Sequence, residues 1–459
     1  MKSILLKGAA LTTGAMMIAA PAFAAPVAEA AEAAAAAAEA VPNPGNNAWM
    51  MTSTILVLMM ILPGLALFYG GLTRSKNMLS TMTQIGATAS LAMLIWVMWG
   101  YSLAFGPEST GALSPFFSTG SYFLSSVTSD TTAATFSDEV ISEYVFVSFQ
   151  MTFAAITAAL ILGATAERMK FSATMLFVPI WLTIVYFPIA HMVWAGGGFL
   201  FEGAMFGLDI PAALDFAGGT VVHINAGVSG LVLAYLLGKR KGYPTEPMPP
   251  HSLTLTMVGT GLLWVGWFGF NAGSELEADG TAGLAMINTF VATAAGGLAW
   301  MVVEKLAGHK GSALGFCSGV IAGLVAVTPA AGNSGPFGAI LLGIIASVVC
   351  YFVVSKVKAK LGFDDSLDAF GIHGVGGIVG AVGTGIVYSP ALGGPGGDDF
   401  AMGAQVTTQI IAVLVAIAWA TVGTLIAGFL VKMTIGLRVD EESEVNGLDI
   451  SEHGERAYN

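Results

Sequence analysis

Long, continuous apolar stretches are the feature that most limits what this chain can fold into. About eleven of them are each long enough to span the ~30 Å hydrocarbon core of a bilayer. Only 10% of the 459 residues are charged and 55% are hydrophobic, whereas soluble domains carry about 25% charged residues. A membrane β-barrel would show short alternating segments instead. The pattern predicts an all-α polytopic membrane protein, with spans near 48–72, 80–105, 144–166, 171–199, 216–238, 253–273, 281–303, 312–329, 336–355, 366–388 and 403–431.

The N-terminus has the composition of a targeting segment. Residues 1–24 combine a basic start, an apolar stretch and a small-x-small ending at Ala24, which predicts a secretory signal peptide. An uncleaved short first helix is the alternative. Residues 25–47 form an Ala/Glu-rich lead-in without an apolar face to bury, expected to be exported and mobile. The membrane domain is expected over 48–433, followed by a cytoplasmic regulatory tail over 434–459.

The distribution of Lys and Arg predicts how the spans are threaded. If the N-terminus lies outside, every Lys and Arg beyond the signal peptide falls in an inside connection or in the tail. This agreement with the positive-inside rule predicts an outside N-terminus, an inside C-terminus and an odd number of spans. The outside loops are acidic, and their charge either concentrates cations or simply keeps the loops soluble. The formal net charge of −12 excludes a nucleic-acid binder.

Two histidines lie inside predicted spans, at equivalent positions of an internal repeat. The segments HINAGVSGLV from His223 and HGVGGIVGAV from His373 share the histidine, two glycines and a valine. They fall on the fifth and tenth spans, so two five-helix halves would have opposite orientation, with an eleventh helix outside the repeat. Inverted repeats with a site at their interface are a recurring transporter architecture. The sequence therefore predicts two inverted five-helix repeats.

Ionisable groups within hydrocarbon are costly, so a functional role for the two histidines is the first hypothesis. The alternative is a structural role, in which each histidine forms a hydrogen bond to a neighbouring helix. Two histidines without an adjacent third ligand make a poor metal site. The preceding carboxylates, Asp215 and Asp368, suit a role in holding loop backbone, although Asp215 could also favour a nearby cation. An intramembrane enzyme is disfavoured because the sequence shows no nucleophile–base set.

Aromatic residues near the outer ends of several spans could bind a small cation. Phe149 and Phe153 lie one turn apart on the third span, and Trp194 ends the fourth. The segment GWFGFNAGS at 266–274 adds further rings and the hydroxyl of Ser274. Such a tryptophan either belongs to the interfacial belt or offers its π-face to a cation, worth ~1–2 kcal/mol.

These motifs, taken in order, resemble the ammonium transporter (Amt/MEP/Rh) family and within it the bacterial Amt branch. The resemblance covers roughly residues 48–459. It rests on LALFYGGL at 65–72, FQMTFAAITAALILGATAERMKFS at 149–172, PIAHMVWAGGG at 188–198, DFAGGTVVHINAGVSGLV at 215–232, GWFGFNAGS at 266–274 and DAFGIHGVGGIVG at 368–380, and on the tail from 436.

The resemblance implies a homotrimer in the bacterial inner membrane, in contact with lipids, with a pore in each subunit and no cofactor or metal. It assigns ammonium recruitment to Phe153, Trp194 and Ser274, with Asp215 beneath them. It implies a gate of Phe153 and Phe270, a pore of His223 and His373, and supporting roles for Phe149, Gln150, Trp267 and Asp368. The connection from 195 to 214 is longer than expected for compact bacterial members, so the resemblance does not predict the shape of the outer vestibule.

The mechanism expected from these roles is recruitment of NH₄⁺ outside, loss of a proton near the phenylalanine gate, and passage of NH₃ beside the histidines. A neutral imidazole offers one donor and one acceptor, which suits a neutral polar molecule. The rival hypothesis is an ammonium sensor that acts through a cytosolic partner, although a tail of about 27 residues is short for a signalling domain. The resemblance also implies a PII-type signal protein docking on the cytoplasmic face.

Overall fold

The computed structural model describes residues 41–201 and 210–458. Within them, 11 helical stretches are long and apolar enough to cross a membrane. Their limits agree with the predicted spans to within a few residues at most ends, so the all-α polytopic fold is confirmed. The predicted signal peptide 1–24 and most of the lead-in 25–47 lie outside the described residues, as does 202–209 of the long connection.

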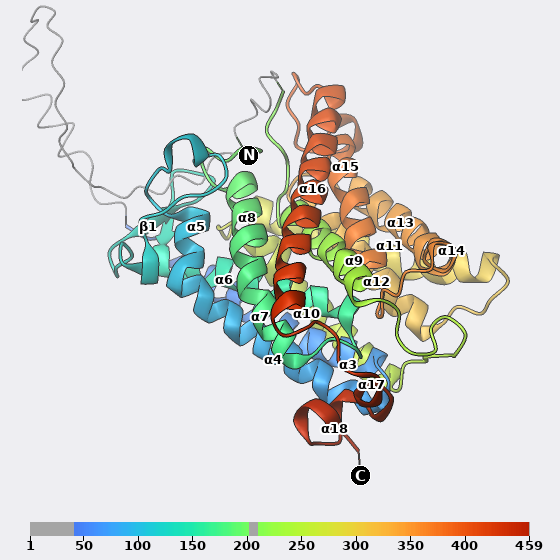
Figure 1. Cartoon of the computed structure of the whole chain (residues 1–459). Helices are drawn as coiled ribbons and strands as arrows, with labels where there is room; N and C mark the ends of the chain where they lie inside the picture. The colour runs from blue at the N-terminus through green and yellow to red at the C-terminus, as the bar shows by residue number, and fades with distance from the viewer. Residues whose placement is uncertain (1–40, 202–209, 459) are drawn as a thin grey trace, which may run out of the picture.

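The first five spans form one half of the bundle (Figure 1). In chain order they consist of α2 (Pro44–Met59) with α3 (Ala66–Leu72), α4 (Met78–Ile95) with α5 (Tyr101–Phe105), α6 (Glu143–Thr165), α7 (Phe171–Trp181) with α8 (Phe187–Trp194), and the π-helical η8 (Gly219–Ile224) with α9 (Asn225–Leu237). A short antiparallel hairpin of β1 (Thr132–Ala134) and β2 (Val140–Ser142) lies in the connection before α6.

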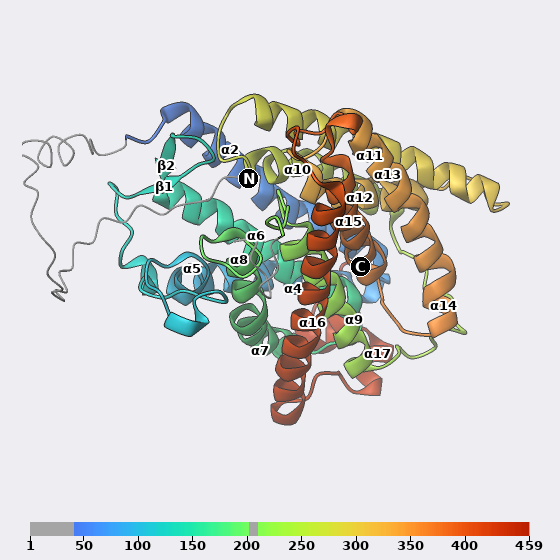
Figure 2. The same cartoon turned by 90° about the horizontal axis from the view of Figure 1, so that it is seen from above.

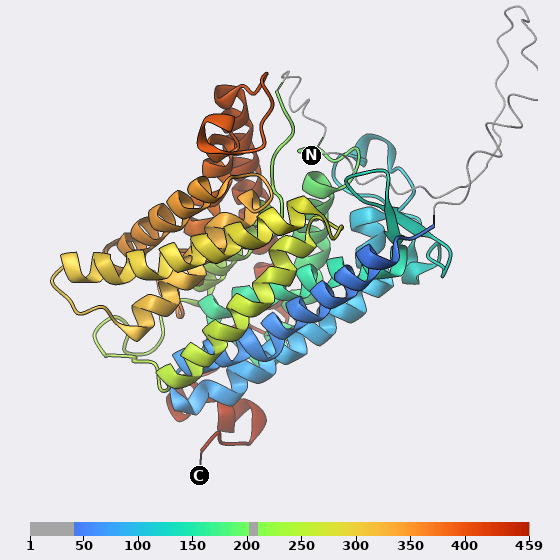
Figure 3. The ribbon, with the colours of Figure 1, turned by 180° about the vertical axis from the view of Figure 1, so that it is seen from behind.

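The remaining spans form the other half and the extra helix. They are α10 (Leu253–Gly273), α11 (Gly280–Leu306), α12 (Ala313–Val327), α13 (Pro336–Phe352) with α14 (Lys358–Leu361), the π-helical η11 (Phe370–Gly374) with α15 (Val375–Val387), and α16 (Met402–Thr434). The first span, blue, runs beside the yellow-green α10 (Figure 3). Seen from above, the β1–β2 hairpin and α14 lie on opposite sides of the molecule (Figure 2).

The first helix begins at Pro44, four residues before the predicted span. The side chain of Asn43 accepts hydrogen bonds from the backbone N–H groups of Gly45 and Asn46 at 2.8 and 3.1 Å. Proline suits the first helical position because its missing N–H would have no partner there. The predicted lead-in therefore contains a helix start that its polar composition concealed.

The internal repeat is visible in how the two histidine-bearing helices cross. A Cβ added at Gly227 would lie 2.3 Å from the backbone nitrogen of Gly374, and one added at Gly377 would lie 3.0 Å from the carbonyl oxygen of Gly219. Each helix thus uses the glycine four residues after its histidine to approach the other closely. The next shared glycines, Gly230 and Gly380, contact α6 and α12, the third span of each half.

The C-terminal tail packs under the bundle through α17 (Glu441–Asn446) and α18 (Leu448–His453), near the C label of Figure 1. We call this end of the bundle the tail face and the opposite end the far face. Tail residues bond to the ends of two spans and to the connection that contains Lys241. The contacts include Arg438 to the carbonyl of Leu237, Asp449 to the N–H of Ser80, Glu444 to the N–H of Lys241, and an ion pair between Lys241 and Glu441.

A buried ionic chain ties the span ends together at the tail face. Glu167 pairs with Arg74 at 2.7 Å and with Arg240 at 2.9 Å, and Arg240 also pairs with Asp364 at 2.8 Å. Burial opposes ionisation of Glu167, but Arg240 and Arg74 outweigh it and hold the pKa of this carboxyl below its usual value. Removing one partner of such a network leaves an uncompensated buried charge, which is strongly destabilising.

Candidate functional site

A small recess opens at the far face, where the sequence predicted substrate recruitment. It has a volume of about 20 Å³. Four of the predicted residues line it, namely Gln150, Phe153, Trp194 and Ser274. The remaining lining residues, which sequence reasoning missed, are Phe136, Phe201, Phe216 and Leu276. Their side chains come from loops that only the fold brings together, so no local motif pointed to them.

The polar groups of the far recess are oriented for a cation. The hydroxyl of Ser274 donates to the carbonyl of Phe270 at 2.8 Å, so its oxygen lone pairs remain available as acceptors. The indole N–H of Trp194 donates to the carbonyl of Asp215 at 2.9 Å, which fixes the ring. Trp194 meets Phe153 edge to face at 5.8 Å between ring centroids. A hydroxyl acceptor and π-faces at one small opening suit a small cation.

Beneath the recess, two stacked phenylalanines close the path. The rings of Phe153 and Phe270 lie 4.2 Å apart between centroids, with 15° between their planes. Phe149 packs against Phe153 at 4.9 Å. Phe153 lines the far recess and Phe270 lines the cavity below it. The pair therefore separates the two spaces, and its apolar faces offer no replacement for the water shell of an ion.

The two histidines meet below the phenylalanine pair. Their Nδ1 atoms lie 3.2 Å apart, so one ring donates and the other accepts. The ring of His223 also stacks on Trp267 at 5.4 Å, and that indole is held by Thr328. Nε2 of His223 is buried and has no hydrogen-bond partner in the described part of the chain.

A cavity of about 10 Å³ lies beside the histidines and is just large enough for one water-sized molecule. We call it the histidine cavity. Apart from His223 and His373, its lining is apolar: Met60, Leu65, Phe68, Ile156, Leu160, Leu263, Trp267, Phe270 and Ile321. An ion would find almost no compensation for lost hydration here. A neutral molecule could bond to an imidazole.

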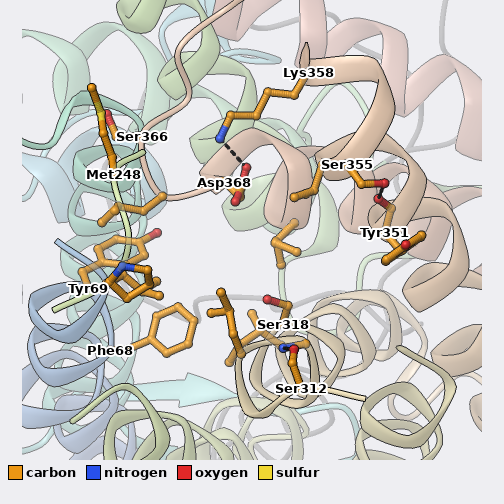
Figure 4. Close-up of a pocket in the computed structure, with 18 of the residues that line it drawn as sticks. Phe68, Tyr69, Met248, Ser312, Ser318, Tyr351, Ser355, Lys358, Ser366 and Asp368 are labelled. Atoms are coloured by element: carbon orange, nitrogen blue, oxygen red, sulfur yellow. Dashed lines mark hydrogen bonds and ion pairs between the residues drawn. The ribbon is translucent and has the colours of Figure 1, made fainter. Parts of the chain in front are cut away.

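A much larger space, the tail cavity, opens from His373 toward the tail face (Figure 4). It measures about 460 Å³, and His373 lines both it and the histidine cavity. In Figure 4, Phe68 and Tyr69 lie on one side of this cavity, with Ser312 and Ser318 below. Lys358 and Asp368 form an ion pair of 2.7 Å within it. The far recess, phenylalanine pair, histidine cavity and tail cavity follow one another as a single column.

Two aspartates begin the two histidine-bearing helices in the same way. The carboxylate of Asp215 accepts hydrogen bonds from the N–H groups of Gly218, Thr220 and Val221 at 2.9–3.1 Å. Asp215 precedes its histidine by eight residues. Burial raises the pKa of this carboxyl to about 6, while the N–H donors oppose the shift.

The counterpart of Asp215 is Asp365, which sequence reasoning missed. Its carboxylate accepts from the N–H groups of Ala369, Phe370 and Gly371 at 2.9–3.2 Å. Asp365 also stands eight residues before its histidine, and this equal spacing is the signal that could have found it. Asp368, predicted to support the site, caps neither turn; it pairs with Lys358 and has a left-handed backbone with φ of 59°.

The described residues contain no group of three or more His, Cys, Asp and Glu side chains arranged to hold a metal ion. Cys317 and Cys350 are buried free thiols. The column is therefore built from aromatic rings, hydroxyls, imidazoles and backbone-capping carboxylates.

Comparison with known proteins decides the family. The sequence profile of the Ammonium Transporter Family matches residues 48–458. The chain belongs to the ammonium transporter family. An ammonium transporter of Aquifex aeolicus is 47% identical over 422 residues, which cover 92% of this chain and 95% of that protein. This family consists of transporters rather than enzymes.

Solved structures of the family share the fold. The crystal structure of Candida albicans Mep2 superposes with a TM-score of 0.78 at 35% identity, covering 88% of each chain. A structure described as a sensor Amt protein gives a TM-score of 0.78 at 27% identity, covering 89% of this chain and 98% of that one. The chain is thus a multi-pass membrane protein of the ammonium transporter family.

Proposed function

We propose that this family member conducts ammonium as ammonia through the column of His223 and His373. The continuity of the column carries the proposal, because it links an aromatic recess with a hydroxyl acceptor to a wide cavity at the opposite face. NH₄⁺ and K⁺ have similar sizes, so size alone cannot separate them. Hydrogen bonding and proton loss can, since K⁺ has no proton to give up.

In this mechanism Trp194, Phe153 and Ser274 hold NH₄⁺ in the far recess through π-faces and a hydroxyl oxygen. Asp215 fixes the turn below and favours a positive charge nearby. Above the pair of Phe153 and Phe270, NH₄⁺ gives its proton to solvent water at the far recess and becomes NH₃, because the apolar space beyond does not solvate an ion. NH₃ then passes along the imidazoles, which exchange donor and acceptor roles with it. Gln150, Phe149 and Trp267 hold the rings in place.

The location, orientation and oligomeric state of the transporter are part of the proposal. We propose a bacterial inner membrane location, with the N-terminus periplasmic after removal of residues 1–24 and the tail face in the cytoplasm. The arrangement of Lys and Arg in alternate connections supports this orientation. A homotrimer is part of the same proposal, with other copies and lipids covering exposed apolar side chains such as Val258, Phe290 and Leu298.

Regulation is proposed at the tail face, where a PII-type signal protein would dock and cover the tail cavity. The tail packed against the membrane domain supports this surface. The likeness to a sensor Amt protein keeps an ammonium sensor as the second candidate function. Reconstituted protein separates the two candidates: a transporter moves ammonium without any partner, whereas a pure sensor does not.

The test of the conduction path is ammonium-evoked current and uptake in liposomes carrying His223→Leu or His373→Leu protein. Both variants are expected to lose ammonium selectivity or most ammonium flux, because each removes a polar partner from the histidine cavity. His309→Gln, in a connection between spans, is the control and should behave as wild type. If both leucine variants keep full, ammonium-selective flux, the pair is not the conduction element.

A further inference from the structure

The two turns that begin the histidine-bearing helices are held by different donors, although their capping carboxylates act alike. At the far face, the indole N–H of Trp194 donates to the carbonyl of Asp215 at 2.9 Å. At the tail face, the ammonium group of Lys358 donates to the carbonyl of Asp365 at 2.6 Å. Trp194 ends the fourth span, and Lys358 begins the last four residues of the ninth span, which is the fourth of the other half.

Lys358 also bonds to the carboxylate of Asp368 at 2.7 Å, so its ammonium group lies between a carbonyl oxygen and a carboxylate oxygen. Both side chains line the tail cavity, which begins at His373. The lysine side chain is 15% exposed and that of Asp368 is 31% exposed, so the pair meets the cavity and is not sealed in the protein. In Figure 4 the two side chains point toward each other across the top of this cavity.

Oxygen ligands of this kind, one neutral and one anionic, would suit a small cation that donates hydrogen bonds. The ammonium group of a lysine has three N–H donors and one positive charge. It therefore donates hydrogen bonds and carries a positive charge, as NH₄⁺ does. Unlike NH₄⁺, it is covalently attached to the chain and cannot leave the site. Of the other charged residues that line the cavity, Arg240 is paired with Glu167 and Asp364, and Glu304 accepts from Ser312. Glu246 also lines the cavity, at an exposed position.

We propose that Lys358 is a specificity-determining residue that permanently fills a cation site at the tail-side mouth of the pore. The far mouth, with Trp194 at the equivalent place, stays open to NH₄⁺, whereas at the tail mouth the ammonium group of Lys358 occupies that place. Ammonium is then captured well from the far face and poorly from the tail face. The inference rests on the proposed conduction function and adds a direction of capture to it.

The test measures half-saturating ammonium separately from each face, in liposomes with protein of one orientation. Wild-type protein should need at least about tenfold more ammonium at the tail face than at the far face. Lys358→Met should lower the tail-face value about tenfold, since it frees the oxygens of Asp365 and Asp368. The far-face value should stay within about twofold.

Two further variants separate the cation site from a general disturbance. Lys358→Arg keeps a tethered cation and should resemble wild type. Lys358→Met combined with Asp368→Asn removes the carboxylate and should return the tail-face value toward wild type. A tail-face value that is unchanged in Lys358→Met, or lowered equally with and without Asp368→Asn, would overturn the proposal.

The wild-type comparison keeps the inference testable even if Lys358→Met does not fold. Equal half-saturating ammonium at the two faces of the wild-type protein contradicts a filled tail-side site. The failure of the conduction proposal looks different, because wild-type protein would then carry no ammonium from either face.

Discussion

The two mouths of the column are built on the same turn and differ in what surrounds it. Asp215 and Asp365 each cap three backbone N–H groups, eight residues before a pore histidine. The far turn is held by an aromatic ring in a recess of about 20 Å³, and the tail turn by a lysine in a cavity of about 460 Å³. The repeat thus gives both histidine-bearing helices the same capped turn. The residues around the turn differ between the halves, so the two mouths offer different groups to a ligand.

The largest expected effect comes from removing either cap. Asp215→Ala and Asp365→Ala each leave three buried N–H groups without an acceptor, at about 1–3 kcal/mol apiece. Both variants should lose at least about 3 kcal/mol of stability and nearly all ammonium uptake. Thermal unfolding in detergent and uptake into liposomes measure this. Asp398→Ala, at an exposed position, is the control. If only one variant is impaired, the two turns are not equivalent.

Replacing Trp194 should show most clearly that the two mouths bind ammonium differently. Trp194→Leu removes the π-face, worth ~1–2 kcal/mol, and the hydrogen bond to Asp215. The half-saturating ammonium concentration at the far face should rise about tenfold, since 1.4 kcal/mol corresponds to a factor of ten. The tail-face value should change less than about twofold. Trp419→Leu removes an indole that donates to a carbonyl outside the column, and it should leave both values unchanged.

The far face should also respond to pH through Glu275, which follows Ser274 in the chain. Burial raises the pKa of Glu275 to about 8, and the charges of Asp279 and Glu277 add to the shift. The carboxyl is therefore neutral below about pH 8 and anionic above it. At constant NH₄⁺ concentration, far-face binding should tighten about threefold as the pH rises through 8, because the carboxylate then adds a negative charge close to the recess. Glu275→Gln should abolish this change, and a persistent change would assign it to another group.

The smallest expected effect belongs to the hydroxyl of Ser274. Ser274→Ala removes one acceptor from the far recess and leaves the stacked rings in place. A typical hydrogen bond contributes about 0.5–1.5 kcal/mol. Because solvent water competes for this acceptor at the open recess, the lower end applies, and half-saturating ammonium should rise about twofold at the far face. Ser274→Thr keeps the hydroxyl and serves as the control. A loss in both variants would point to packing at this position.

Much of this architecture could be predicted from the sequence because a membrane imposes strong patterns. Continuous apolar stretches marked the spans, and the histidine repeat indicated which two helices meet. The family resemblance supplied the aromatic recess, where Gln150, Phe153, Trp194 and Ser274 do come together. The start of the first helix was wrong by four residues, because the capping signal of Asn43 and Pro44 lies in a polar segment.

The residues that sequence reasoning missed depend on contacts between distant segments. Asp365 lies next to Asp364 and near Asp368, so the sequence distinguishes it only by its eight-residue spacing to His373. Its hydrogen bonds to three N–H groups identify it in the structure. In the sequence, Lys358 is one of several basic residues whose positions predict the orientation of the chain. Its role at the tail mouth appears only when the ninth span ends beside the turn that begins the tenth.

The most direct test of the account is ion-selective flux through wild-type protein in liposomes, with current and internal pH recorded together. We expect ammonium-evoked flux from the far face and no flux when K⁺ replaces ammonium, because the space around His223 and His373 does not solvate an ion. The current recorded alongside shows whether the proton crosses with the ammonia. Comparable K⁺ and ammonium flux, or no ammonium flux in folded protein, would contradict the account.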